Sequence, residues 1–371
     1  MKFLRNFSRL LVGAVFIFSG FVKGIDPLGT TYRIEDYFIA YGMDWGIPMA
    51  LFLSVFLSTL EFFLGVALVL NLKIKYLSWI LFPMMAFFTL LTFYDALFEP
   101  VPDCGCFGDA ITLSNWETFY KNIVLILLVS VIFFQRKKYH PPYPGLVQVI
   151  LGLIFGLGFG GYSYYNYNHL PVIDFRNWTV GSNMNPDNQG EVKIYLTYRN
   201  KETGETREYL SPDYPWNDSI WMSNWEFVSQ RIDDSEVVKG HQLVIETEEG
   251  ADVTDDFINN PAPQLLVIAH DLTETHRPAF GEINELYKKA ENEGISMIVI
   301  TSSLPGIVEQ FKKDMKLDPY LEFYHADDVV LKTMIRANPG LMLLEDAYVL
   351  GKWHYNDIPD FNKIQKKYLS E

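Results

Sequence analysis

The stretch Ile47–Leu70, IPMALFLSVFLSTLEFFLGVALVL, is apolar except for a few small hydroxyl residues and one charged residue, Glu61. A helix needs about 20 residues to cross the hydrocarbon core of a membrane, so this stretch is long enough for one crossing. Four further runs have a similar character: Phe7–Phe21, Tyr76–Phe98, Phe119–Phe134 and Leu146–Tyr165. The sequence therefore predicts five membrane-spanning helices.

The loops between these runs alternate in charge. Basic residues without acidic neighbours precede the first run, separate the second from the third, and follow the fourth; the other loops carry Asp and Glu. Cytoplasmic loops are enriched in Lys and Arg, so the amino terminus is predicted to lie in the cytoplasm. We expect a multi-pass protein of the bacterial cytoplasmic (inner) membrane, with its carboxy-terminal half in the periplasm, where disulfides persist.

The chain has two cysteines, Cys104 and Cys106, in a loop on the predicted outer side. A disulfide across one intervening residue closes a small, strained ring, and strain makes a disulfide a better oxidant. Asp103 and Asp109 disfavour a thiolate, so a cation is needed, and Lys23 at the same membrane edge is the candidate. The pair is predicted to cycle between thiol and disulfide. Inert loop thiols and binding of copper(I) by two soft ligands are the alternatives, and no complete metal site is predicted.

Glu61 falls near the middle of its predicted span, where a carboxylate is costly and marks a functional site by default. One interpretation is a proton relay that serves a membrane quinone, the one cofactor the sequence suggests. The other is a buried hydrogen bond between helices, with Ser54, Ser58 or Arg9 as the partner. Lys23 and Arg9 also have a simpler interpretation, because long basic side chains at helix ends snorkel to the membrane surface.

The chain after the fifth run is acidic, with 19 Lys and Arg against 35 Asp and Glu after residue 166. Such a surface repels phosphates, so nucleic acid is excluded as a partner. Residues 168–262 are predicted to be β-rich, with strands at Lys193–Tyr198 and Thr206–Leu210.

From residue 263, buried-strand runs alternate with helical spacing and end in a hairpin and a last helix, which is an α/β pattern. The predicted strands are Leu265–Ala269, Ile295–Thr301, Leu321–Tyr324, Gly340–Leu344 and Tyr348–Trp353, and the predicted helices are Phe280–Glu293, Ile307–Met315, Val329–Ile335 and Phe361–Leu369.

This order of elements, with Asn338-Pro339-Gly340 before the hairpin, resembles a thioredoxin fold, and Pro339 would match its cis-proline. Where that family carries Cys-x-x-Cys, this chain has the segment from His270 to His276, which contains no thiol. The domain therefore cannot exchange disulfides itself, and we expect it to dock a periplasmic client or a thiol–disulfide partner. The two histidines either bind a metal or partner, or belong to a solvated loop.

The first 135 residues resemble the DoxX superfamily, and the Cys-Gly-Cys-Phe-Gly loop resembles its MauE (methylamine utilisation) branch. The matching residues are Arg9, Gly13, Phe16, Ser19, Gly20, Lys23, Asp26, Pro27, Glu61, Gly65 and Cys104–Gly108. The combination with a thioredoxin-like tail is similar to a group of Bacteroidetes membrane proteins. The resemblance implies a four-helix membrane bundle and a role in handling disulfides of envelope proteins.

Together these observations predict an α-helical membrane bundle followed by an α/β soluble domain. The predicted divisions are a four-helix membrane domain at 1–140, a fifth helix and linker at 141–167, a β-rich segment at 168–262, and a degenerate thioredoxin-like domain at 263–371. The leading hypothesis is a membrane thiol–disulfide oxidoreductase, or an accessory to one, with Cys104, Cys106, Glu61 and Lys23 as its site. A non-enzymatic scaffold or chaperone whose tail binds a partner, and a copper-handling membrane protein, are the alternatives.

Overall fold

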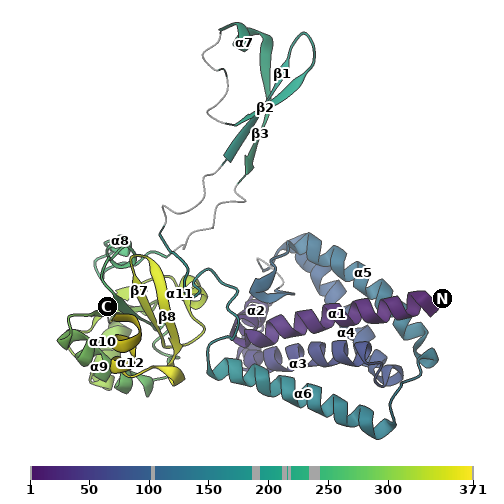
Figure 1. The fold of residues 1–371 in the computed structure, drawn as a ribbon, viewed down its shortest axis with the longest axis horizontal. Helices are drawn as coiled ribbons and strands as arrows, with labels where there is room; N and C mark the ends of the chain where they lie inside the picture. The colour runs from purple at the N-terminus through teal and green to yellow at the C-terminus, as the bar shows by residue number, and fades with distance from the viewer. Residues whose placement is uncertain are drawn as a thin grey trace.

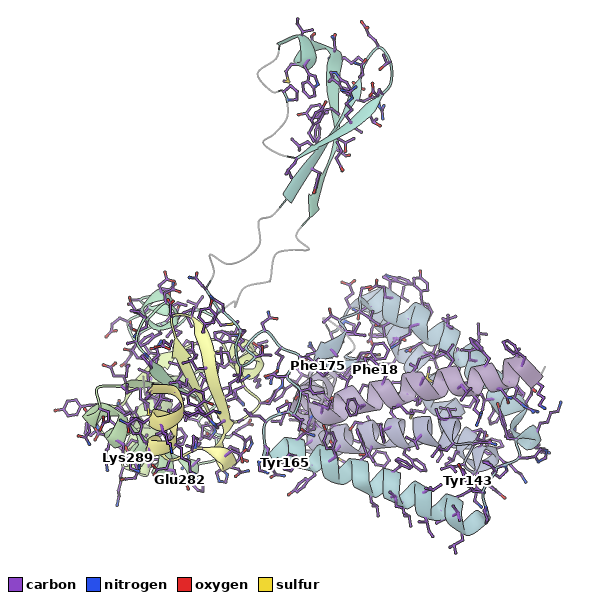
Figure 2. The ribbon with its side chains drawn as sticks, viewed as in Figure 1. Phe18, Tyr143, Tyr165, Phe175, Glu282 and Lys289 are labelled. Atoms are coloured by element: carbon purple, nitrogen blue, oxygen red, sulfur yellow. The ribbon has the colours of Figure 1, made fainter. Side chains whose placement is uncertain are left out.

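The computed structural model describes residues 2–101, 105–185, 193–210, 215, 219–233 and 243–369. Its described parts form a helical bundle, a small antiparallel sheet and an α/β domain (Figure 1). Figure 2 adds the side chains and shows the α/β domain packed against one end of the bundle.

Within the described residues, five helices are long and apolar enough to cross a membrane, as predicted, so this is a multi-pass membrane protein. They are α1 (Lys2–Ile25), α3 (Ala50–Val69, extended by a 3-10 helix at Asp44–Met49), α4 (Ile74–Phe98), α5 (Asn115–Phe134) and α6 (Gly145–Asn168). Most begin before the predicted apolar runs, because polar residues form their first turns. In α5, for example, the Ser114 hydroxyl accepts from the Glu117 amide, and the Glu117 carboxylate accepts from the Ser114 amide.

A further helix, α2 (Pro27–Ala40), was not predicted from the sequence. Asp26 caps it by accepting from the Gly29 amide at 2.8 Å, and Pro27 occupies its first turn. Its buried Thr31 side faces the bundle, and the Ser54 hydroxyl of α3 donates to the Pro27 carbonyl at 2.7 Å. This helix forms part of the end of the bundle that carries the cysteine loop.

The three basic segments lie together at the opposite end of the bundle. The Tyr139 hydroxyl donates to the Arg5 carbonyl, and the Lys73 amide donates to Gln148. The α/β domain lies at the end of the bundle that carries the cysteine loop (Figure 1). This separation of the basic loops from the carboxy-terminal domain agrees with the predicted topology.

Close contact between α1 and α3 depends on glycine. A Cβ at Gly20 would lie 2.4 Å from the Phe62 backbone nitrogen, and one at Gly65 would lie 2.5 Å from the Ile17 nitrogen. Glycine at these two positions therefore allows the backbones of α1 and α3 to approach closely. In α6, Gly152 and Gly156 face Phe63 of α3 and Gly160 faces Thr59, but a Cβ at these glycines would lie 3.3, 3.9 and 3.6 Å from those side chains, so this contact depends much less on glycine.

The small sheet has the strand order β2-β1-β3, all antiparallel. Its elements are β1 (Lys193–Asn200), β2 (Thr206–Leu210), a short helix α7 (Ser219–Asn224) and β3 (Trp225–Asp233). The predicted turn between β1 and β2 is confirmed, since the Gly204 amide donates to the Asn200 carbonyl at 2.9 Å.

The α/β domain has a five-stranded sheet in the order β6-β5-β4-β7-β8. β4, β5 and β6 run parallel, and β7 and β8 form an antiparallel hairpin beside β4. The strands are β4 (Gln264–Ile268), β5 (Ser296–Thr301), β6 (Glu322–His325), β7 (Gly340–Glu345) and β8 (Tyr348–His354); the helices are α8 (Thr254–Ile258), α9 (Ala279–Asn292), α10 (Pro305–Met315), α11 (Asp328–Met334) and α12 (Phe361–Ile364), which continues into a π-helical turn. The Asn338–Pro339 peptide bond is cis.

Apolar cores lie on both faces of this sheet. One contains Phe280 of α9 and Phe361 of α12. The other contains Met334 of α11 together with Trp178 and Ile245, which come before β4 in the chain. The α/β class predicted for this region is confirmed.

Candidate functional site

A buried ion pair joins α1 to α3. The Lys23 Nζ lies 2.8 Å from Glu61 Oε1 and 2.9 Å from Oε2, and the exposed fractions of the two side chains are 13% and 7%. A carboxylate at this depth is costly without a partner, and Lys23 supplies the opposite charge. Lys23 is therefore not a snorkelling anchor.

The expected partners of Glu61 were wrong. Ser54 donates to Pro27 and Ser58 donates to the Ser54 carbonyl. Arg9 donates to the Leu68 carbonyl at 3.0 Å, near the other end of the bundle. The actual partners come from α1 because the glycine contacts fix which turns of α1 and α3 face each other.

Ser19 connects this ion pair to the cysteine loop. Its hydroxyl lies 2.8 Å from Glu61 Oε2 and also 2.8 Å from the Cys106 carbonyl oxygen. A hydroxyl carries one hydrogen, so it donates fully to one of these acceptors at a time. In either case the hydroxyl joins the Glu61 side chain and the Cys106 backbone in one polar cluster.

Cys106 is a half-buried, free thiol, whereas Cys104 lies outside the described residues. Gly105 and Gly108 have φ values of +57° and +52°, which favour glycine and let the loop turn back on itself. Phe107 then packs against Phe18 of α1, and Lys121 of α5 lies 4.4 Å from its ring centre. The loop is thus attached to both α1 and α5.

A cavity of about 90 Å³ opens beside this cluster between α1, α4 and α5. Its wall is polar near the cysteine loop and apolar deeper in the bundle. The polar part comes from Ser19, Lys23, Tyr37, Glu61, Cys106, Lys121 and Asn122, and the apolar part includes Met85, Phe88 and Leu125. A volume of this size holds several water molecules or a small organic group. The lining brings together three of the four predicted site residues, Lys23, Glu61 and Cys106.

The two histidines of the thiol-free segment have different surroundings. His270 Nδ1 lies 3.2 Å from Asp328, and its ring meets the edge of Tyr32 from α2. The His276 ring stacks on Tyr355 at 4.4 Å. Among the residues that the structure describes, no group of three or more His, Cys, Asp or Glu side chains is arranged to hold a metal.

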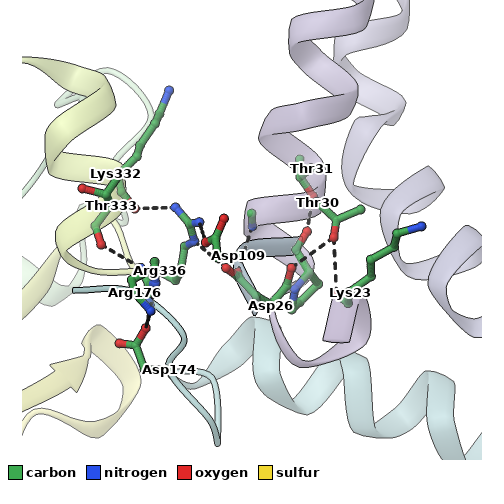
Figure 3. A network of polar contacts seen from close by, with 12 residues as sticks. Lys23, Asp26, Thr30, Thr31, Asp109, Asp174, Arg176, Lys332, Thr333 and Arg336 are labelled. Atoms are coloured by element: carbon green, nitrogen blue, oxygen red, sulfur yellow. Dashed lines mark hydrogen bonds and ion pairs between the residues drawn. The ribbon is translucent and has the colours of Figure 1, made fainter. Parts of the chain in front are cut away.

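The α/β domain also reaches the site directly. Arg336, just after α11, lies between Asp26 and Asp109, each of which it contacts at 2.8 Å (Figure 3). Sequence reasoning missed this residue; the only signal was its position two residues before Asn338-Pro339.

Residues 1–135 match the model of the family described as methylamine utilisation protein MauE. The match covers α1 to α5, so it contains Ser19, Lys23, Glu61 and the cysteine loop. The helix α6 and both sheets lie beyond it. No curated protein matches the chain. The predicted resemblance of the membrane part to MauE is therefore confirmed.

Proposed function

We propose that this protein is a membrane thiol–disulfide oxidoreductase, or an accessory for disulfide formation in envelope proteins, that uses Cys104 and Cys106. One observation carries the proposal: Ser19 links the Cys106 backbone to the buried Lys23–Glu61 pair. This arrangement supplies a cation for a thiolate and a carboxylate that can accept a proton, which are the two groups that thiol exchange requires.

Disulfide exchange between a client dithiol and the Cys104–Cys106 pair takes two steps. A client thiolate attacks the Cys104–Cys106 disulfide and forms a mixed disulfide, and the second client thiol then displaces the bound sulfur. The client gains a disulfide and gives up two electrons and two protons, and the Cys104–Cys106 pair becomes a dithiol. Lys23 favours the Cys106 thiolate as the leaving group, and Glu61 accepts a proton from the client thiol and passes it to Cys106 as the dithiol forms.

Reoxidation of the pair needs an acceptor of two electrons and two protons, and we propose a membrane quinone. The cavity beside Cys106 fits part of such a molecule, with apolar walls for a ring and donors such as Lys121 and Asn122 for an oxygen. When bound, a quinone would supply the oxidising equivalent; the Glu61 carboxylate would accept a proton that leaves the thiols, and the Lys23 ammonium would stabilise the thiolate.

We also propose a client-docking role for the carboxy-terminal domain and an orientation of the protein in the membrane. Sheet order β6-β5-β4-β7-β8, with its terminal hairpin, supports a thioredoxin-like domain that has lost its thiols and docks a client. The shared position of the basic segments supports a cytoplasmic amino terminus and a periplasmic tail, in a bacterial inner membrane.

The test is to trap the intermediate. In cells that carry Cys106→Ala, the remaining Cys104 should be captured in a mixed disulfide with a client, which is seen as a reducible band on a non-reducing gel. The Cys104→Ala/Cys106→Ala variant is the control and should give no band. Failure to trap an adduct with either single variant, together with a pair that stays reduced in native membranes, would overturn the proposal.

A scaffold is the second candidate, and the ion pairs of Arg336 favour it because they hold the thiol-free tail on the bundle. Truncation after Tyr167 would then abolish the cellular phenotype, while Cys104→Ala would leave it intact.

A further inference from the structure

One guanidinium connects the α/β domain to both sides of the cysteine site. Arg336 is 5% exposed, and its Nε and Nη2 atoms contact Asp26 Oδ2 and Asp109 Oδ2, each at 2.8 Å (Figure 3). Its Nη1 donates to the Lys332 carbonyl, which fixes the side chain to its own domain. Arg336 therefore bridges two acidic residues that are far apart in the sequence.

Each acidic partner adjoins a group of the proposed site. Asp26 comes three residues after Lys23 and caps α2. Asp109 comes three residues after Cys106, in the 3-10 turn Gly108–Ala110. One side chain of the α/β domain thus ties the end of α1 to the loop that carries Cys106.

The surrounding residues are fitted to this contact. The Tyr32 ring of α2 lies 5.4 Å from the Arg336 guanidinium carbon and 4.8 Å from Lys332 Nζ. A Cβ at Gly29 would lie 2.8 Å from Arg336 Nη2 and 2.5 Å from Asp26 Oδ2, so glycine leaves the space that the ion pair occupies. Burial alone would raise the pKa of Asp26, but the charges of Arg336 and Arg176 more than offset it and hold that pKa below its usual value.

We propose that Arg336 is a positioning residue, through which the α/β domain holds the loop Gly105–Asp109 beside Lys23 and so sets the reactivity of Cys106. The importance of this reactivity rests on the proposed function, but the positioning does not. Without Arg336 the carboxylates of Asp26 and Asp109, which are 14% and 33% exposed, would lose the cation they share, and their repulsion would move the loop away from α1. A lysine does not replace it, because a compact ammonium group lacks the planar fork whose separate nitrogens, Nε and Nη2, reach the two carboxylates at once.

Several charged or titratable groups surround the cysteine loop, and the test must keep their charges constant. They are Lys23 of α1, Arg33 and Tyr37 of α2, Glu61 of α3, Lys121 of α5 and Asp109 of the loop itself. Arg336→Lys and Gly29→Ala preserve every one of these charges. Arg277→Lys is the matched control, since Arg277 lies on the same domain, half-exposed, beside Asp314.

The measurement is the pH profile of Cys106 alkylation by a small bimane reagent, in the full-length protein with Cys104→Ser. The plateau rate at high pH reports the access of the reagent to Cys106. The pH at the midpoint of the profile reports how strongly the Cys106 thiolate is stabilised. Arg336→Lys and Gly29→Ala should each raise the midpoint by about one pH unit, which lowers the rate at pH 7 roughly tenfold. Arg277→Lys should leave it unchanged.

Unchanged midpoints in both Arg336→Lys and Gly29→Ala would overturn the proposal. If one variant does not fold, the other decides, because they disturb the contact from opposite sides. The assay uses no client, so shifted midpoints with no trapped mixed disulfide would refute the proposed function and leave the positioning role of Arg336 in place.

Discussion

Lys23 and Glu61 provide the strongest test of the membrane site, through a double-mutant cycle. Their contact is bidentate, at 2.8 and 2.9 Å, and both side chains are largely excluded from solvent. The variants are Lys23→Met and Glu61→Gln, alone and together. Met matches the length of Lys without its charge, and Gln keeps an oxygen that can accept from Ser19.

The single variants each leave one buried charge without its counter-ion. Removal of one partner from a buried ion pair costs about 3–5 kcal/mol, so each should lower the free energy of unfolding by about 3 kcal/mol after some relaxation. The double variant leaves neither charge, and its loss should fall short of the sum of the single losses by about 2–3 kcal/mol.

Reversible unfolding in dodecylmaltoside micelles with increasing dodecylsulfate, followed by tryptophan fluorescence, measures these free energies. Lys138→Met, an exposed lysine at the far end of the bundle, is the control and should change stability by less than about 0.5 kcal/mol. Losses that add within about 0.5 kcal/mol would refute the reasoning, because they would mean that the two groups do not stabilise each other.

Two further predictions concern the helix contact and the α/β domain. Gly20→Ala should prevent α1 from packing on α3, because the new Cβ would lie 2.4 Å from the Phe62 nitrogen. Gly158→Ala in α6 is the control and should retain the folded protein, since its Cβ would meet nothing within 4 Å. Equal yields of monodisperse protein from the two variants on size-exclusion chromatography would contradict this prediction. Burial lowers the pKa of His354 from 6.5 to about 4, so the unfolded chain takes up a proton that the folded chain refuses, and about 3 kcal/mol of stability should be lost as the pH falls from 6.5 to 4. His354→Asn keeps an acceptor for the Asn356 amide but does not titrate. Hydrogen exchange of the β8 amides should therefore depend less on pH between 6.5 and 4 in this variant. An unchanged dependence would show that His354 does not cause the loss of stability.

The membrane helices were predictable because a bilayer imposes a length and a polarity that one sequence reveals. Ile47–Leu70 is long and apolar enough for one membrane-spanning helix, and α3 ends within one residue of that prediction. Buried strands were equally visible: the run from Leu265 anticipates β4, whose five residues are all buried. In contrast, α2 was missed because a short helix with mixed polar and apolar residues has no comparable pattern.

The pairing inside the site was harder to predict. Glu61 was identified by its cost in an apolar run, but its partner depends on the relative register of two helices. That register follows from glycine contacts such as Gly20 with Phe62, which one sequence does not reveal. The contact of Arg336 with Asp26 joins residues 310 positions apart, and no local pattern indicates it.

The ion pair between α1 and α3 also has a consequence for biogenesis. The ribosome makes Lys23 before Glu61, which comes 38 positions later in the chain. Until the later helix is translated, the nascent chain holds an ammonium group at the membrane edge whose counter-ion does not yet exist. Release of the first helix from the translocon into lipid is therefore favoured only after the next hairpin has been synthesised, so the two helices should enter the bilayer as a unit.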